Sequence, residues 1–251
     1  MTKTILITGA TSGIGEAIAH IFAQNGYRLI LTGRRSERLA ALKESLATEV
    51  LTLCFDVQNN EEVQKHLENL PEDWQEIDIL VNNAGLAAGL SSIQEGKLDD
   101  WERMIDTNLK GLLYVTRCIS PKMIARGKGG HIINISSVAG KEVYPNGNVY
   151  CATKHAVDAL SKAMRIDLLP HHIKVTNIAP GMVETEFSLV RFEGNAEKAD
   201  SVYKGFQPLL PEDVAETVYF AATRPPHVCL NDILIMPTAQ AAATIVKRIE
   251  S

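Results

Sequence analysis

The sequence lacks paired cysteines, and this absence excludes two kinds of site. Its four cysteines lie far apart and form no Cys-x-x-Cys motif or His/Cys cluster: Cys54, Cys118, Cys151 and Cys229. Neither a zinc site nor a disulfide framework is therefore indicated, and we expect no bound metal. Isolated thiols are typical of proteins from a reducing compartment.

The sequence also lacks an excess of positive charge and any long apolar run. A net charge of −5 at pH 7 argues against general nucleic-acid binding, although it allows a local basic pocket for a phosphate group. No apolar stretch is long enough to cross a bilayer. Because the first residues lead directly into a strand-like run, we expect no signal peptide. We therefore expect a cytoplasmic protein that binds neither nucleic acid nor membrane.

Short apolar runs alternate along the chain with amphipathic stretches of helical length. The runs expected to be strands are Thr4–Thr8, Arg28–Thr32, Val50–Phe55, Ile77–Asn82, His131–Ser136, Lys174–Ile178 and Ile233–Met236. The stretches expected to be helices are residues 14–25, 36–46, 59–69, 98–126, 148–169 and 211–223. Because strands that alternate with helices build parallel βαβ units, the pattern predicts an α/β fold with a doubly wound, mainly parallel sheet and helices on both faces.

We expect one domain over residues 1–251, because no linker, repeat or shift in composition divides the chain. A polar, irregular segment at residues 184–210 follows the sixth expected strand and contains Gly194, Gly205 and Pro208. Long loops beyond the carboxyl end of a strand are often lids over active sites, so we expect a substrate lid here. A surface insertion without a role in function is the alternative.

A glycine-rich turn joins the first expected strand to the first expected helix. It is Thr8-Gly-Ala-Thr-Ser-Gly-Ile-Gly15, with the spacing Gly-x-x-x-Gly-x-Gly. Glycines allow a tight turn and a close approach of the backbone to a ligand. The N-terminus of the following helix offers free N–H groups to a pyrophosphate. We therefore predict dinucleotide binding at this turn, with a plain strand-to-helix connection as the alternative. The residues concerned are Gly9, Ser12, Gly13, Ile14 and Gly15.

Two arginines at the end of the second expected strand indicate which dinucleotide binds. An NAD site has a carboxylate here, which accepts a hydrogen bond from the 2′-hydroxyl of the ribose. This chain has Thr32-Gly-Arg-Arg-Ser36, and Glu37 is the first acid. The guanidinium groups of Arg34 and Arg35 suit a 2′-phosphate, so we predict NADP. Two solvated surface arginines are the alternative.

Three further residues have the chemistry of acid–base catalysis on a carbonyl or an alcohol. Tyr150 and Lys154 stand four residues apart on an expected helix, so their side chains share one face. A neighbouring ammonium group favours the phenolate and is expected to lower the pKa of Tyr150 from about 10. Ser137 directly follows a strand-like run, so its hydroxyl lies at the carboxyl end of a strand, where ligands bind in open α/β sheets. Together these residues suit protonation of a carbonyl oxygen.

From about residue 3 to residue 236 the chain resembles the short-chain dehydrogenase/reductase (SDR) superfamily. The matching motifs are the glycine turn, Asn82-Asn-Ala-Gly85, Ser137, Tyr150-x-x-x-Lys154 and Pro180-Gly181, in order and at the family's spacings. The resemblance implies a Rossmann-type sheet of seven parallel strands and a homotetramer. It also implies an enzyme that transfers a hydride reversibly between NADP(H) and a secondary alcohol or ketone.

The resemblance implies a role for each matching residue. Tyr150 is the general acid or base, Lys154 lowers its pKa and binds the nicotinamide ribose, and Ser137 orients the substrate oxygen. Asn108 holds a water in a proton relay through Lys154. The remaining cofactor-binding residues are Asp56 and Val57 at the adenine, Asn82, Ala84 and Gly85 along the cofactor backbone, and Pro180, Gly181, Val183 and Thr185 at the nicotinamide end.

The setting of Asn108 supports a special role for its amide. It falls on an otherwise apolar stripe of the helix expected over residues 98–126. A buried amide without partners costs about 1–3 kcal/mol, so we expect Asn108 to hold a water or open backbone groups. A purely structural asparagine that kinks the helix is the alternative, and the two roles are compatible.

Within the superfamily the chain is most similar to the NADP-dependent 3-hydroxy acid dehydrogenases, which act on serine, allo-threonine and related short acids. The similar stretches are Met104–Gly111, Tyr144–Tyr150, Glu186–Phe192 and Met236–Gln240. A small carboxylate substrate needs a cation in its pocket, and Arg191 in the expected lid could form a bidentate pair with it. A surface or subunit-contact role for Arg191 is the alternative.

Two other functions compete with this interpretation. A general NADP-dependent ketone or 3-oxoacyl reductase would use the same catalytic residues, but no basic run offers a docking surface for an acyl carrier protein. A redox sensor that binds NADP without turnover is the other alternative. Sensors of that kind commonly lose the catalytic Tyr or Lys, whereas this chain retains both.

Overall fold

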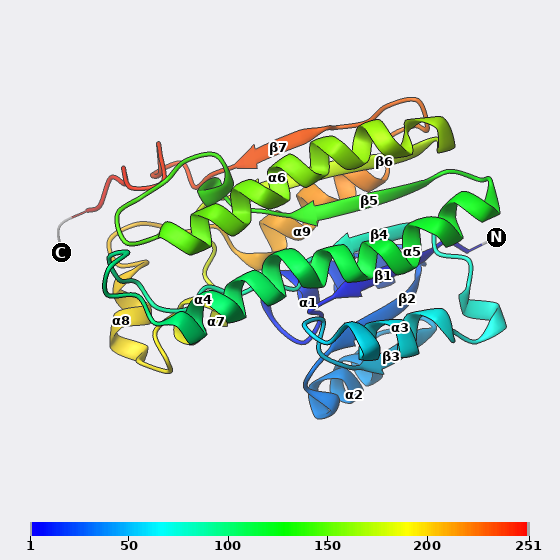
Figure 1. Ribbon diagram of the computed structural model, residues 1–251, viewed down its shortest axis with the longest axis horizontal. Coiled ribbons are helices and arrows are strands. Elements are labelled where there is room, and N and C mark those ends of the chain that lie inside the picture. Colours follow the sequence, from blue (N-terminus) through cyan, green and yellow to red (C-terminus); the bar gives the residue numbers. More distant parts are fainter. Residues whose placement is uncertain (1, 250–251) are drawn as a thin grey trace.

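The computed structural model describes residues 2–249 and shows one seven-stranded parallel sheet (Figure 1). Its strand order is β3-β2-β1-β4-β5-β6-β7. The strands are β1 (Thr4–Thr8), β2 (Arg28–Gly33), β3 (Val50–Cys54), β4 (Ile79–Asn82), β5 (Gly130–Ile135), β6 (Ile173–Pro180) and β7 (Asp232–Ile235). The chain winds outward in both directions from β1, so the order reverses between β1 and β4. Ligands bind at such a point in open α/β sheets.

Helices cover both faces of the sheet, which explains why the central strands are continuously apolar. One face carries α1 (Gly13–Gln24), α2 (Ser36–Ser45) and α9 (Pro211–Ala222), and they enclose a core that includes Phe22 and Val218. The other face carries α3 (Asn60–Glu68), α5 (Leu112–Arg126) and α6 (Asn148–Leu168), around a core that includes Ile119 and Met164. Figure 1 shows α5 and α6 in front of the sheet and α9 behind it.

The predicted fold class is confirmed, and the predicted strands and helices agree with the structure to within a few residues. One helix differs. The helix expected over residues 98–126 is divided into α4 (Leu98–Ile105), a π-helical turn at Asp106–Gly111 and α5. Such turns insert an extra residue into a helix and often occur at functional sites.

The expected lid is less irregular than its composition suggests. It contains two short helices, α7 (Glu186–Arg191) and α8 (Ala196–Ser201), each capped by a side chain. Thr185 accepts a hydrogen bond from the backbone of Phe187, and Asn195 accepts one from that of Lys198. Both helices lie beyond the arrowheads of the central strands in Figure 1, where the expected ligand site opens.

The C-terminal residues pack against the lid. The backbone of Ile249 donates a hydrogen bond to Gly205, and Arg248 donates to the carbonyl of Val202 and lies over the ring of Phe206. Within residues 2–249, none of the helices has both the length and the apolar character needed to span a membrane.

Candidate active site

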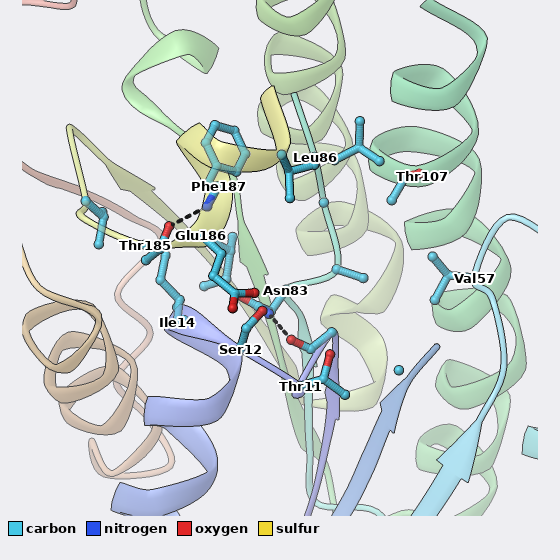
Figure 2. Close-up of a pocket in the computed structure, with 18 of the residues that line it drawn as sticks. Thr11, Ser12, Ile14, Val57, Asn83, Leu86, Thr107, Thr185, Glu186 and Phe187 are labelled. Atoms are coloured by element: carbon cyan, nitrogen blue, oxygen red, sulfur yellow. Dashed lines mark hydrogen bonds between the residues drawn. The ribbon is translucent and has the colours of Figure 1, made fainter. Parts of the chain in front are cut away.

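A cleft lies at the carboxyl ends of the central strands, between the glycine turn and the lid (Figure 2). Its walls come from the turn after β1 and from the ends of β2, β3, β4, β5 and β6. Helix α6 and the beginning of α7 complete them. Because parallel strands all end on one side of the sheet, residues far apart in sequence meet here.

The glycine turn has the shape of a phosphate cradle. Gly9 and Gly13 have φ values of 67° and 55°, in the left-handed region that favours glycine. A Cβ on Gly13 would lie 3.1 Å from the Thr185 side chain and would fill the space between the turn and the lid. Helix α1 begins at Gly13, so its free N–H groups face the cleft, as pyrophosphate binding requires.

Gly15 is buried behind the turn and does not line the cleft, unlike Gly9, Ser12, Gly13 and Ile14. A Cβ on Gly15 would lie 2.4 Å from the carbonyl oxygen of Gly9. The structure therefore corrects the prediction that Gly15 contacts the cofactor. Gly15 allows α1 to approach the turn closely, a packing role that the spacing of the glycines does not distinguish from ligand contact.

The two predicted arginines stand at the entrance of the cleft, and no carboxylate ends β2. Arg34 makes an ion pair with Asp56 at 3.4 Å. Arg35 donates hydrogen bonds to the hydroxyls of Ser12 at 2.7 Å and Thr11 at 2.9 Å. Both arginines line the cleft, so its chemistry fits a cofactor with a 2′-phosphate.

The middle of the cleft agrees with prediction except at Asn82. Asp56, Val57, Ala84 and Gly85 all line the cleft. Asn82 points into the core, where it donates to Thr116 and Asn134, so the structure corrects its assignment as a cofactor contact.

The next residue along, Asn83, lines the cleft instead (Figure 2). Its side chain donates to the carbonyls of Thr8 and Gly9 and holds the glycine turn against β4. Neighbouring side chains at the end of a strand point in opposite directions, but this alternation does not say which of the two faces the cleft.

The expected nicotinamide end is built by the turn that follows β6. Pro180, Gly181, Val183 and Thr185 all line the cleft. The turn is held by Gln240, which accepts a hydrogen bond from the backbone of Met182 at 2.8 Å.

Ser137, Tyr150 and Lys154 meet at the inner end of the cleft. Ser137 caps a 3-10 turn at Val138–Gly140, and its hydroxyl oxygen accepts a hydrogen bond from the backbone of Ala139. Tyr150 and Lys154 both project from α6, and the Lys154 Nζ lies 5.9 Å from the centroid of the Tyr150 ring. That Nζ donates to the carbonyl oxygen of Ile135 at 3.0 Å, and this bond fixes its position.

Burial shifts the two titrating groups in opposite directions. It raises the pKa of the Tyr150 phenol, and the hydrogen bond from Ser137 offsets this rise only in part. It also lowers the pKa of Lys154, from 10.5 to about 8. The expected lowering of the Tyr150 pKa by Lys154 is therefore wrong for this structure. The ammonium faces a backbone carbonyl and is not among the groups that shift the phenol.

Asn108 lies behind the cleft, in the π-helical turn. Its amide accepts a hydrogen bond from the backbone of Leu86 and donates to the Leu86 carbonyl, each at 2.8 Å, and it donates to Thr153. The expectation that it satisfies open backbone groups is confirmed. A Cβ on Gly85 would lie 3.3 Å from both the Asn108 Oδ1 and the Lys154 Nζ, so these two atoms approach the same point. The water relay stays a prediction.

Arg191 lies beside Tyr150, the predicted catalytic tyrosine. Its guanidinium carbon is 5.7 Å from the centroid of the Tyr150 ring and 5.6 Å from that of Tyr144. Its Nε donates to the carbonyl oxygen of Gly89 at 3.3 Å. Arg191 and Tyr150 also line a small crevice that adjoins the cleft. The position next to Tyr150 favours the predicted substrate contact over a purely surface role.

Several cleft residues had no clear signal in the sequence. They are Thr11, Phe55, Asn83, Leu86, Thr107, Glu186, Phe187 and Val190, among others. Phe187 lies close to Tyr150, with ring centroids 5.8 Å apart. These residues come from loops, from the π-helical turn and from the short lid helices, which carry no strong periodicity. Among the described residues, no three His, Cys, Asp or Glu side chains gather into a group that could hold a metal ion.

Fold and cleft together define a dinucleotide-binding oxidoreductase of the doubly wound α/β class. Residues 3–195 match the family model for short chain dehydrogenases, and the chain belongs to that family. The predicted SDR resemblance is thus confirmed.

The relatives carry names that agree with the NADP prediction. The chain is 50% identical over 240 residues to an NADP-dependent 3-hydroxy acid dehydrogenase, YdfG, of Salmonella typhi, across 95% of this chain and 96% of that one. It is 46% identical over 243 residues to a serine 3-dehydrogenase of Rhizobium radiobacter, across 97% of each chain. A solved structure of the closed form of serine dehydrogenase complexed with NADP+ superimposes with a TM-score of 0.92 at 46% identity, over 98% of this chain and all (100%) of that one.

Proposed function

We propose that this protein is an NADP-dependent dehydrogenase of short 3-hydroxy acids, with serine or allo-threonine as the type of substrate. The observation that carries this proposal is the Arg191 guanidinium beside the ring of Tyr150. It provides a cation for a carboxylate next to the group that handles the proton of the substrate hydroxyl. The names of the relatives support the same substrate class.

The residues of the cleft fit NADP. The turn around Gly13 leaves room for a pyrophosphate, and Arg34 and Arg35 suit the 2′-phosphate. Bound NADP would supply the hydride acceptor, and NADPH the hydride donor. We assign cofactor contacts to Gly9, Ser12, Gly13, Ile14, Asp56, Val57, Ala84, Gly85, Pro180, Gly181, Val183 and Thr185.

The protein's own part in the reaction is to hold the substrate oxygen and move its proton. Ser137 and Tyr150 bind the oxygen at the reacting carbon. In reduction the Tyr150 hydroxyl donates its proton to this oxygen, and a phenol whose pKa is raised by burial is fully protonated at neutral pH. Oxidation needs the reverse transfer, so the Tyr150 phenol must first lose its proton before the phenolate can accept the proton of the substrate hydroxyl. Lys154, whose pKa is about 8, can exchange protons near neutral pH and would pass the Tyr150 proton on toward solvent.

The proposed substrates include a primary alcohol as well as the secondary alcohols that the predicted reaction covers. Serine carries its hydroxyl on a primary carbon, whereas allo-threonine carries it on a secondary carbon. The proposal therefore covers oxidation at C3 of a short hydroxy acid, with the carboxylate paired to Arg191. Oxidation of a secondary C3 gives a 3-oxo acid, which can lose CO2 without the enzyme.

We also propose a homotetramer in the cytoplasm. Strand β7 is the last strand of the sheet and pairs with β6 on one side, among the described residues. Its Leu234 is 51% exposed, and near the end of α6 Ile166 and Leu169 are 74% and 72% exposed. Exposed apolar side chains of this size favour contacts between subunits.

A substrate panel tests the proposed function. Purified protein is mixed with NADP or NAD and with L-serine, L-allo-threonine, 3-hydroxypropionate or a simple secondary alcohol, and formation of reduced nicotinamide is followed by absorbance. We expect turnover with NADP and the hydroxy acids, and little with NAD or the alcohol. Equal activity on acids and simple alcohols would favour the general ketone reductase. Binding without reduction would favour the redox sensor.

A further inference from the structure

A carboxylate on the lid meets two arginines at the entrance of the cofactor cleft. Glu186 is the first residue of α7, and it accepts two hydrogen bonds from Arg38 Nη1, each 2.9 Å long, and one of 3.1 Å from Arg35. Glu186 and Arg35 line the cleft, whereas Arg38 lies one turn further along α2. Neither Glu186 nor Arg38 belongs to the catalytic group or to the predicted cofactor contacts.

The contacts of Arg35 make this cluster more than a local ion pair. The same guanidinium donates to Thr11 and Ser12 of the glycine turn and to Glu186 of the lid. Arg35 itself stands at the start of α2. It therefore connects three walls of the cleft, since the glycine turn lies 23–24 residues from Arg35 in the sequence and Glu186 lies 151 residues from it. Figure 2 shows Glu186 reaching from the lid toward Ser12 and Thr11.

We propose that Glu186 and Arg38 form a latch that holds the lid against α2 and so retards release of the bound cofactor. This inference rests on the proposed NADP-dependent function. Glu186 and Arg35 both line the cleft, so a cofactor bound between the glycine turn and the nicotinamide end would lie beneath their contact. Its release past this contact would require the lid to separate from α2, which would break the contacts of Glu186 with both arginines.

The exposure of the three side chains suits a latch that opens often. The side chains of Arg35, Arg38 and Glu186 are 42%, 47% and 44% exposed. Ion pairs at such exposure are individually weak and are screened by salt. The two arginines keep the pKa of Glu186 below its usual value, first through the hydrogen bond from Arg38, so the latch remains charged at neutral pH.

The alternative is that Glu186 serves only to orient Arg35 toward a 2′-phosphate. The two roles differ in their effect on a cofactor without that phosphate. A latch across the cleft retains NADPH and NADH alike. A residue that only orients Arg35 affects NADPH alone.

Stopped-flow displacement of NADPH and of NADH, followed by nicotinamide fluorescence, separates these roles. We measure wild type, E186Q, R38Q and the double variant E186Q/R38Q. The matched control is E76Q, which removes the exposed Glu76–Lys128 ion pair of 3.0 Å outside the cleft. We expect E186Q and R38Q to release both cofactors about three- to tenfold faster. The double variant should release each cofactor less than about twofold faster than E186Q does, because the two residues act as one contact.

The isotope effect provides a second readout, since a residue with a merely structural role would not change it. If opening of the lid limits turnover, substrate deuterated at C3 should show a larger isotope effect on kcat in E186Q than in wild type. Three results would overturn the latch: release of NADPH alone becomes faster, release becomes slower, or both rates match wild type and E76Q. If wild type binds no nicotinamide cofactor, the proposed function fails, and that result is distinct from wild-type binding with unchanged release rates in the variants.

Discussion

At Tyr150, burial keeps the phenol, our proposed acid–base group, protonated at neutral pH. The phenol pKa is raised chiefly because the ring is enclosed. Tyr150→Phe removes only the hydroxyl and keeps the ring that packs near Phe187. We expect this variant to lose at least about 100-fold in kcat, the usual contribution of a positioned acid or base, and to bind NADP as wild type does. Steady-state kinetics and a fluorescence titration measure the two quantities, and retained turnover would contradict the assigned role.

We predict that the buried ammonium group of Lys154 lowers the free energy of unfolding, although the enzyme needs this residue for activity. Its pKa falls from 10.5 to about 8 because the ammonium is buried, so between these pH values the unfolded chain binds more protons than the folded one. The free energy of unfolding therefore rises with pH across this window. The pKa difference corresponds to roughly 3 kcal/mol at pH 7. We expect Lys154→Met to be inactive but more stable by about 1–3 kcal/mol at pH 7, an estimate that allows for the lost bond to Ile135.

Urea unfolding of wild type and Lys154→Met at pH 7 and at pH 10 tests whether the variant has the higher free energy of unfolding. The advantage of the variant should shrink at the higher pH, because the wild-type lysine is then neutral in the folded state. A variant that is less stable than wild type at pH 7 would show that the ammonium contributes net stability through its hydrogen bond.

Arg191 is predicted to bind the substrate carboxylate. Arg191→Ala should lower kcat/KM for serine by about 10²-fold or more, because a desolvated charge pair with two hydrogen bonds is lost. Arg191→Lys keeps the charge without the planar fork, so it should recover only part of this loss. A simple alcohol without a carboxylate is the control substrate, since its kcat/KM should change little. If serine kinetics are nearly unchanged in Arg191→Ala, Arg191 does not contact the substrate.

Among the elements, the π-helical turn at Asp106–Gly111 is the feature most closely tied to the site. It brings Asn108 against the backbone of Leu86, beside the loop that carries Gly85. We expect Asn108→Ala to destabilise the fold by about 1–3 kcal/mol, because the N–H and C=O of Leu86 lose their buried partner. It should also lower kcat more than it weakens NADP binding.

Urea unfolding and steady-state kinetics measure both effects of Asn108→Ala. The control is Asn69→Ala, which removes an exposed amide that donates to the carbonyl of Lys65 at the end of α3. Unchanged stability in Asn108→Ala would mean that water replaces the amide. Unchanged kcat would exclude the predicted relay.

Most elements were predictable from the sequence because their physical signals are local. Strands such as Thr4–Thr8 are buried on both faces and have an apolar centre. Helices such as Asn60–Glu68 begin at a capping side chain and show an apolar stripe. The π-helical turn was not predicted, since one extra residue scarcely disturbs the apolar stripe. The short helices α7 and α8 were also missed, because their six residues each are too few for a periodic pattern.

For the whole molecule we predict a tetramer. A tetramer with dihedral symmetry uses two distinct contacts, and the exposed Leu234 of β7, Ile166 of α6 and Leu169 just after α6 are candidates for them. Light scattering after size exclusion should give four times 27.5 kDa, about 110 kDa. Leu234→Lys should reduce this mass to that of a dimer if β7 forms one of the contacts. A wild-type mass of 27.5 kDa would exclude the tetramer.

The sequence by itself determined the order of strands and helices and the cofactor class, and it predicted the catalytic residues Ser137, Tyr150 and Lys154. These depend on local patterns and on spacing along the chain. Only the tertiary structure decided which of the neighbours Asn82 and Asn83 faces the cleft, that Gly15 packs behind it, and that Glu186 meets Arg38. It also decided the direction of the Tyr150 pKa shift. Packing brings distant segments together and removes water from between them, and neither the partners of a side chain nor its burial can be read from its place in the chain.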